Sequence, residues 1–292
     1  MTHIRLTLLA LVVVVAAAAC GGDGNDDSGD DPTTTAPPGA TTTTAGDDDG
    51  SDGDGGSGEI AARVYFARDE KIATAGRTIA TPAVGRHSLE ALLDGPDGFE
   101  TDIGMSTAIP AGSELLDIDV GDGLATVDLS GDFATGGGSL SMELRVAQVV
   151  FTLTQFETVD TVTVLLDGQE ATEGIGGEGI PATGVDRGDY ENVTPFVLVE
   201  SPVPGQEVTS PVTISGIANT FEANVAYDVT DPEGLIVAEG STQATAGNGV
   251  WGDFEVTVEF RTERTGLGAV IAFQDDMESG GRRDVYEVPV RM

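Results

Sequence analysis

The chain has 292 residues, of which 13 are Lys or Arg and 50 are Asp or Glu, so its formal net charge at pH 7 is −37. A negative charge of this size repels nucleic acids and anionic lipid surfaces, so neither is expected as a partner. The single cysteine, Cys20, excludes an intrachain disulfide, and the only histidines are His3 and His87, so no zinc site of Cys and His ligands can form.

The first segment is short, positively charged at its start and then apolar. Arg5 precedes the run Leu6–Ala19, which is interrupted only by Thr7. A membrane-spanning helix needs about 20 apolar residues, so this run is too short for a comfortable span. The pattern is typical of a secretory signal peptide, and we expect residues 1–19 to be removed from the mature protein.

Small residues stand directly before the lone cysteine. The sequence "AAAAC" ends at Cys20 and resembles the lipobox of bacterial lipoproteins, with Ala17 in place of the usual leucine. In that family the cysteine thiol receives a diacylglycerol and becomes the new N-terminus, and two acyl chains give stable anchoring. The resemblance implies lipidation of Cys20 and attachment to the extracytoplasmic face of the cell membrane. The alternative is an ordinary secretory signal with an incidental cysteine.

Residues 20–58 form the next segment. It begins at Cys20 and continues with a stretch rich in Gly, Asp, Thr and Pro. It contains ten aspartates and no Lys or Arg. Such a composition cannot bury enough apolar surface to offset the chain entropy lost on folding. We predict a disordered, acidic tether that separates the folded part from the membrane.

The remaining residues are predicted to form two domains, 59–187 and 188–292, which meet at the polar segment "GVDRGDYENVTP". In the first, a hairpin is expected around Asp122-Gly123 because alternating apolar runs flank this dipeptide. A long helix is expected to follow, with Ser139 or Ser141 as its cap. The predicted order is β-α-β-β-α-β, an α+β fold with strands at 59–68, 115–120, 124–133 and 161–168 and helices at 86–93 and 136–156.

The second domain contains seven strand-like segments separated by turns rich in Gly, Pro, Asn and Asp. This spacing predicts an all-β immunoglobulin-like sandwich. Pro289 is expected on an edge strand because proline cannot donate to a ladder. The predicted strands are 196–201, 211–218, 224–230, 235–241, 251–260, 269–275 and 285–290.

Both domains resemble known families. "IPAGSELLDIDVGDGLATVDLSGDF" and "GGGSLSMELRVAQVVFTLTQFETVDTVTVLLDG" resemble the GerMN domain of sporulation and germination lipoproteins over residues of about 62 to 180. "VESPVPGQEVTSPVTISGIANTFEANVAYDV" resembles the immunoglobulin-like Gmad domain over about 196 to 290. The resemblance implies envelope localisation and no established enzymatic activity. The GerMN fold is similar to ring-building motifs of envelope secretion machines, which implies self-association.

Few residues offer catalytic or metal-binding chemistry. His87 is the only imidazole left after signal cleavage, and a solvated position at a helix start is favoured over a general base. Asp117 and Asp119 match part of a calcium-loop pattern, but Gly121 stands where a third ligand is needed, so a strand is favoured. The loop 274–284 is acidic and could bind Ca²⁺ weakly, although a solvated loop balanced by its two arginines is favoured.

Trp251 is the candidate ligand contact. If the alternation of the strand around Phe254 and Val256 continues backwards, the indole lies on the outer face, where it could stack on a sugar ring. If the turn at Gly252 resets the phase, the indole covers the end of the core. The second interpretation is favoured because large aromatic side chains bury most of their area.

The sequence therefore predicts no catalytic, cofactor or metal residues. The favoured function is a non-enzymatic, lipid-anchored interaction or assembly module of the cell envelope, related to sporulation or germination. The alternative is a lipoprotein that binds cell-wall glycan or a small ligand. A cell-wall hydrolase is disfavoured because no nucleophile–base pair is evident. The expected partners are the membrane, through a diacylglyceryl anchor, and envelope proteins or cell-wall glycan.

Overall fold

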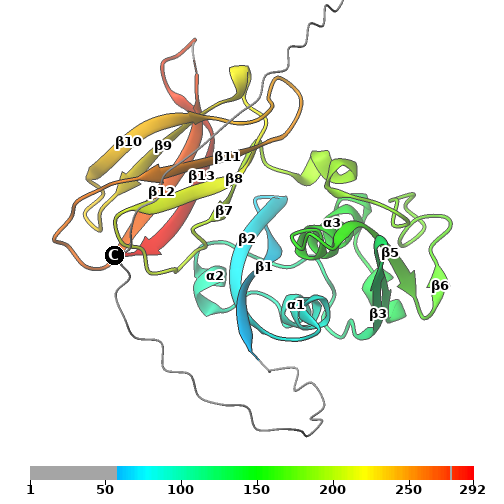
Figure 1. Cartoon of the computed structure of the whole chain (residues 1–292). Helices are drawn as coiled ribbons and strands as arrows, with labels where there is room; N and C mark the ends of the chain where they lie inside the picture. The colour runs from blue at the N-terminus through cyan, green and yellow to red at the C-terminus, as the bar shows by residue number, and fades with distance from the viewer. Residues whose placement is uncertain (1–57, 277) are drawn as a thin grey trace, which may run out of the picture. The chain divides into compact units, whose positions relative to one another are not determined.

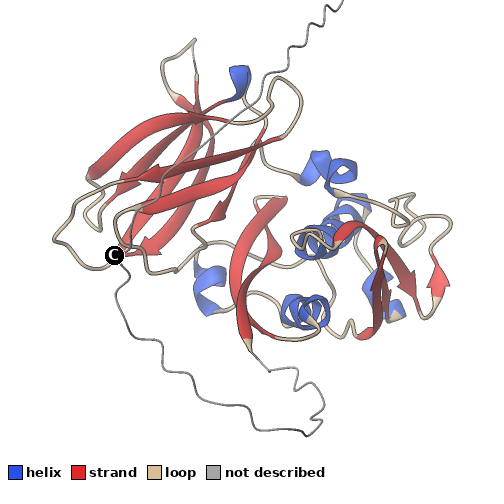
Figure 2. Cartoon of the chain, viewed as in Figure 1, coloured by secondary structure: helices blue, strands red, loops and turns tan. Residues whose placement is uncertain are grey.

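The structure is a computed structural model that describes residues 58–276 and 278–292, all within one unit, Gly53–Met292. The predicted signal peptide, Cys20 and the tether lie outside the described residues. An α+β domain comes first and an all-β sandwich follows, so the predicted fold class is confirmed (Figures 1 and 2). No helix of the described residues is long and apolar enough to cross a membrane.

The first domain contains six strands and three α-helices among the described residues. They are β1 (Glu59–Arg68), β2 (Lys71–Ala80), α1 (Val84–Leu93), α2 (Gly98–Asp102), β3 (Leu115–Gly121), β4 (Gly123–Leu129), α3 (Ser139–Leu153), β5 (Val159–Leu166) and β6 (Gln169–Glu170). The sandwich contains all seven predicted strands, with ends shifted by at most three residues. They are β7 (Val197–Ser201), β8 (Val212–Ala218), β9 (Asn224–Thr230), β10 (Ile236–Gln243), β11 (Gly252–Val258), β12 (Leu267–Asp275) and β13 (Arg282–Arg291).

The predicted hairpin is present. β3 and β4 pair antiparallel up to Gly121 and Leu124, so the loop is the dipeptide Asp122-Gly123. Both residues have positive φ, 53° and 81°, as a type I′ turn requires. β4 also pairs with β5 in parallel, across the α3 connection, so the sheet β3-β4-β5-β6 is mixed and β3 is one of its edges.

β2 was not predicted, because "KIATAGRTIA" lacks the clean apolar alternation of a half-buried strand. It pairs with β1 along its whole length, from Glu59 with Ala80 to Arg68 with Lys71. The burial of β1 is likewise not confined to alternate residues. Val64, Tyr65 and Phe66 are all buried, so both faces of this hairpin are covered.

The predicted cap of the long helix was wrong. Gly138 is the N-cap of α3, and no side chain caps it. Ser139 donates to Glu178 Oε2 at 2.6 Å, and Ser141 Oγ accepts from Arg145 Nη2 at 3.2 Å. The helix is buried on nearly all sides because β1, α1 and β5 pack around it, and Leu140 is its one exposed large apolar side chain.

Arg145 lies inside the first domain and was not identified from the sequence. Its guanidinium donates to the carbonyl oxygens of Ala108, Phe133, Thr135 and Gly136 at 2.8–2.9 Å. Burial lowers the pKa of Arg145. The side chain thus satisfies carbonyl groups of two segments, the loop between α2 and β3 and the segment that precedes α3. Arginine suits this role because its guanidinium donates several hydrogen bonds.

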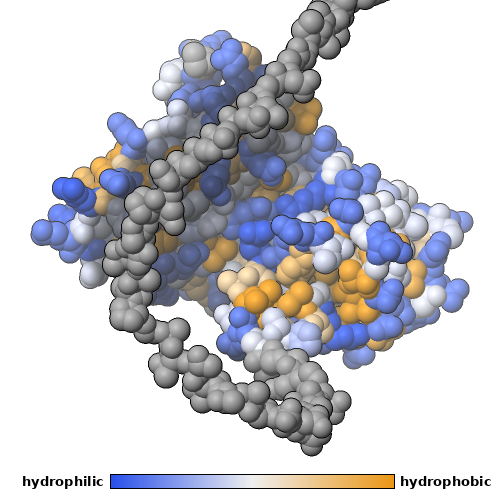
Figure 3. Space-filling model, viewed as in Figure 1, coloured by the Kyte–Doolittle hydropathy of each residue, from blue (hydrophilic) through white to orange (hydrophobic). Residues whose placement is uncertain are grey.

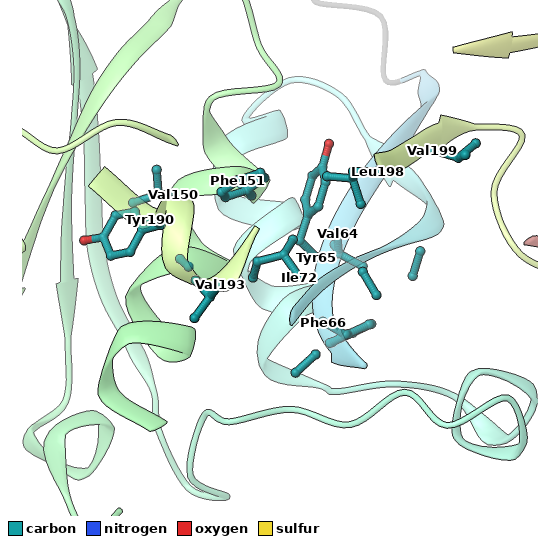
Figure 4. Packing of buried hydrophobic residues seen from close by; sticks show 14 of the residues in the cluster. Val64, Tyr65, Phe66, Ile72, Val150, Phe151, Tyr190, Val193, Leu198 and Val199 are labelled. Atoms are coloured by element: carbon teal, nitrogen blue, oxygen red, sulfur yellow. The ribbon is translucent and has the colours of Figure 1, made fainter. Parts of the chain in front are cut away.

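The sandwich consists of the sheets β10-β9-β12-β13 and β11-β8-β7. Pro289 lies in β13, an edge strand of its sheet, as predicted. The buried residues of this domain belong to the same hydrophobic cluster as those of the first domain. Figure 4 shows part of this cluster, including Tyr65 and Ile72 of the first hairpin and Leu198 of β7.

A polar network joins the two domains within this cluster. Arg187 Nη1 donates to Glu200 Oε1 at 2.8 Å, and the Tyr65 hydroxyl donates to the same oxygen. Arg187 also donates to Thr154 Oγ1 at 2.9 Å, and its guanidinium lies 4.7 Å from the centroid of the Phe151 ring. Glu200 of the sandwich is thus held by residues of β1 and of the segment that precedes β7.

The network fixes the charge states of its members. Burial raises the pKa of the Tyr65 phenol well above its usual value, and the Glu200 charge adds to this, so Tyr65 stays neutral. Burial also tends to raise the pKa of Glu200. The charges of Arg187 and Arg63 and the hydrogen bonds from Tyr65 and Arg187 outweigh it, so the Glu200 pKa lies below its usual value. Whether the segments 59–187 and 188–292 fold alone stays a prediction.

The substitution Glu200→Gln tests this network. It should lower the free energy of unfolding by about 2–3 kcal/mol at pH 7, because Arg187 then lacks its counter-charge in a partly buried site. A lowered carboxylate pKa contributes stability above its unfolded value of about 4.3, and this contribution is lost as the pH falls through the folded pKa. Urea unfolding should therefore show the difference from wild type shrinking below about pH 4.

The matched control is Glu207→Gln, which removes an exposed carboxylate from the same domain. We expect a change within about 0.5 kcal/mol for this surface position. An equal loss in both variants, or a Glu200→Gln deficit that is unchanged at pH 3, would contradict the network's role.

Candidate functional site

A groove with a volume of about 790 Å³ lies between the two domains. Its floor is one face of the β1–β2 hairpin, where the register pairs Arg63 with Gly76 and Ala61 with Thr78. One wall is Gln155–Phe156, just after α3, and the other is the Ser201–Gln206 segment that connects β7 to β8. Clefts at domain interfaces are common sites for small ligands.

The hairpin sequence sets the shape of this floor. Three of its four paired positions carry no side chain larger than threonine, namely Ala61, Gly76 and Thr78. At Gly76 a Cβ atom would lie 2.5 Å from Cγ2 of Val203. Glycine therefore allows the β7–β8 connection to approach the hairpin closely, and any larger residue would push this wall outward.

Two arginines of the hairpin, Arg63 and Arg77, line the groove. Arg63 lies on the face described above. Its backbone is fixed by Gln155, whose Oε1 accepts from Arg63 N at 2.7 Å and whose Nε2 donates to Arg63 O at 2.6 Å. Its Nε donates to the Tyr65 hydroxyl at 3.1 Å. Within the described residues Arg63 has no carboxylate within 4.0 Å, whereas Arg77 binds Glu100 with both Nη atoms.

Trp251 directly precedes β11 and lines a small cavity together with Phe151 and Arg187 of the first domain. The alternation of β11 continues back through the buried Gly252, so Trp251 has the opposite phase from Phe254, and whether it covers the end of the core stays a prediction. Its indole is half-buried and donates from Nε1 to Pro195 O at 3.2 Å. The ring stacks on Phe196, with centroids 6.1 Å apart and planes inclined by 7°. A ligand contact by Trp251 stays a prediction.

His87 lies within α1 rather than at its cap, which is Ala83. In the described part of the chain its ring makes one hydrogen bond, from Nδ1 to Ala80 O, at 2.8 Å. Asp117 lies in the extended strand β3 and accepts from Arg86 Nη2 at 2.9 Å. These positions do not bring a base and a nucleophile together.

The acidic segment 274–284 makes ion pairs and hydrogen bonds with the sandwich and within itself. Arg282 pairs with the buried Asp228, and its guanidinium lies 4.5 Å from the centroid of the Phe273 ring. Asp276 accepts from Ser279 and from Glu278 N. Across residues 58–276 and 278–292, no group of three or more His, Cys, Asp or Glu residues could hold a metal ion.

The edge strand β3 exposes apolar side chains. Leu116 and Val120 are 45% and 43% exposed, and β3 pairs with another strand, β4, on one side only. On the face drawn in Figure 3, hydrophobic residues gather over the region where Figure 1 places α1 and β3. Exposed apolar patches and unpaired sheet edges mark surfaces that can bind other proteins.

Comparison with known families identifies both domains. A family model described as sporulation and spore germination (Germane) matches residues 63–172. A second model, described as an immunoglobulin-like domain of bacterial spore germination (Gmad2), matches residues 196–281. No curated protein matches the chain.

Three solved structures show partial likeness. A proposed lipoprotein from Clostridium perfringens is 21% identical, over 47% of this chain and 93% of that one, with a TM-score of 0.33. The tandem GerMN domains of the sporulation protein GerM from Bacillus subtilis are 19% identical, over 68% and 61% of the two chains, with a TM-score of 0.36. The first of these domains alone is 22% identical, over 44% and 95%, with a TM-score of 0.32.

The assignment of the domains rests on the two family models, which agree with the α+β fold and the sandwich described above and with the resemblance noted in the sequence. The chain therefore carries a sporulation and spore germination domain of the GerMN type, followed by an immunoglobulin-like domain of bacterial spore germination.

Proposed function

We propose that this protein is a lipid-anchored, non-enzymatic protein of the cell envelope that acts in sporulation or germination by binding partner proteins. The observation that carries the proposal is the apolar edge strand β3. It offers Leu116 and Val120 together with an unpaired backbone edge, and a strand of another chain can add to such an edge. Self-association through this edge is one form that the interaction takes.

The sequence around Cys20 supports the anchor. A short apolar run ends in small residues and a single cysteine, and an acidic segment of about 38 residues leads from there to the described domains. The anchor would hold the protein at the extracytoplasmic face of the membrane. The anionic surface of the protein would keep the domains away from anionic lipid headgroups.

The family descriptions support a role in germination rather than in catalysis. The descriptions of both matched families refer to sporulation or spore germination, and neither description names a reaction. Among the described residues the single imidazole, His87, has a backbone carbonyl as its partner. The geometry thus offers binding surfaces and no assembled acid–base pair.

Substitution of Cys20 by serine tests the anchor. Without the thiol no diacylglycerol can be attached, so metabolic labelling with a fatty acid should be lost. The protein should move from the membrane fraction to the soluble or precursor pool. Membrane association that persists in the Cys20→Ser variant after a high-salt wash would contradict lipid anchoring.

The double variant Leu116→Asp, Val120→Asp tests the interaction surface. Chemical crosslinking in intact cells should give species of higher mass that contain this chain, and the variant should lose them because two charges replace apolar contacts. The control is Leu235→Asp, Ile236→Asp, which changes side chains that are 56% and 48% exposed in the sandwich. Equal crosslinking in both variants, with unchanged thermal stability, would argue against the β3 edge.

A second candidate function is the binding of cell-wall glycan at the pair Phe196 and Trp251. Phe196 is 50% exposed and is supported from behind by the stacked indole. Aromatic faces of this kind stack on sugar rings in many binding sites. The indole is the only one in the chain, so its fluorescence reports this position alone.

Titration with soluble cell-wall glycan fragments tests this candidate. Binding should change the emission of Trp251, and Phe196→Ala should abolish the change while Phe221→Ala, another exposed phenylalanine of the sandwich, should not. Unchanged emission over the titration would leave protein binding as the sole candidate.

A further inference from the structure

We propose that the groove between the two domains binds a short peptide that carries a carboxylate, and that Arg63 recognises this carboxylate. The proposal is independent of protein binding at β3 and of glycan binding at Trp251. It rests on three features of the groove: an arginine that makes no ion pair with any described residue, a local excess of positive charge, and a floor of small side chains between apolar walls.

Arg63 has donors available for a ligand. Its Nε is used by the Tyr65 hydroxyl, and its two Nη atoms make no hydrogen bond within the described residues. Other buried or half-buried arginines of the chain are occupied: Arg77 by Glu100 and Arg187 by Glu200. A guanidinium fork matches a carboxylate in geometry and binds it with two parallel hydrogen bonds.

The carboxylate that lines the groove makes no ion pair with Arg63 within 4.0 Å, although the charge of Arg63 contributes to its lowered pKa. Glu200 lines the groove, but its Oε1 already accepts from Arg187 and from the Tyr65 hydroxyl. Arg63, Arg187 and Glu200 together therefore carry a net charge of about +1 at neutral pH, since arginines stay protonated. In a chain of net charge −37 this local excess is unusual, and it favours an anionic ligand group.

The remaining lining restricts the rest of the ligand. Ala61, Gly76 and Thr78 form a low floor over which an extended main chain can lie. The hydroxyls of Thr78 and Ser201 make no hydrogen bond in the part of the chain that the structure describes and can bind its amide groups. Phe156, Val203 and Pro204 supply apolar walls for small side chains. A volume of about 790 Å³ suits a peptide of a few residues.

The carboxylate can come from two sources, the C-terminus of a peptide or an acidic side chain within one. Three probes separate them: acetyl-Ala-Ala-Ala with a free C-terminus, its C-terminal amide, and acetyl-Ala-Asp-Ala amide. Residues 21–292, the mature chain without its lipid, are labelled with ¹⁵N, and the Nε–H resonance of Arg63 is followed during titration. At least one of the carboxylate probes should shift it in a saturable way, and the tripeptide amide should not.

Variants assign the effect to the guanidinium fork. Arg63→Gln should weaken binding of the effective probe at least about tenfold, measured by calorimetry, and Arg63→Lys should give an intermediate loss because it keeps the charge without the fork. Arg261→Gln, which removes an exposed arginine of the sandwich, should bind as wild type does. Thermal melting of each variant shows that it is folded.

Four results would overturn the proposal. The tripeptide amide could bind as well as the acid, Arg63→Gln could bind like wild type, or neither carboxylate probe could shift the Arg63 resonance. An equal loss in Arg261→Gln would show that general charge, rather than the groove, governs binding, and would overturn it as well. If Arg63→Gln fails to fold, two measurements still test the proposal. They are the affinity of Arg63→Lys for the effective probe and the difference in wild-type binding between the tripeptide acid and its amide.

Discussion

The joint between the two domains depends on one partly buried polar contact, in which Glu200 of the sandwich accepts from Tyr65 and Arg187. A carboxylate in this position is costly unless it is paired and hydrogen-bonded, and both conditions are met. Once the contact forms, Tyr65 can be fully buried, and the second face of the β1–β2 hairpin becomes part of a core. The hydrophobic cluster then runs through both domains without a break.

This joint explains which parts of the fold the sequence could and could not predict. The β3–β4 hairpin and the seven strands of the sandwich were predictable, because their turns and alternation are local signals. β2 was missed because its pattern reflects two covered faces, one of which is covered by a domain more than 100 residues later in the chain. The partners of Trp251 were missed for a similar reason: Phe196 and Pro195, which contact the indole, belong to a different segment.

The arginines show how a strongly acidic chain uses its few cations. Arg145 satisfies carbonyl groups of two loops, Arg187 holds the domain joint, and Arg282 neutralises the buried Asp228. Each of these arginines compensates a polar group that would otherwise be buried without a partner. Their positive charges are therefore paired inside the fold, and the surface stays negative. None of these roles has a sequence motif, because each depends on partners brought together by tertiary contacts.

The groove follows from the same joint, and it has no counterpart in either domain alone. Its floor belongs to the first domain, while Glu200 and the wall at Val203 belong to the sandwich and its first loop. Because the network of Tyr65, Arg187 and Glu200 fixes these parts, Arg63 is held in place before any ligand arrives, which lowers the entropy cost of binding. The family of either domain, taken alone, therefore cannot predict this groove. The combination of the two domains in one chain creates it, and the close approach at Gly76 shows that the hairpin sequence is fitted to the domain that follows.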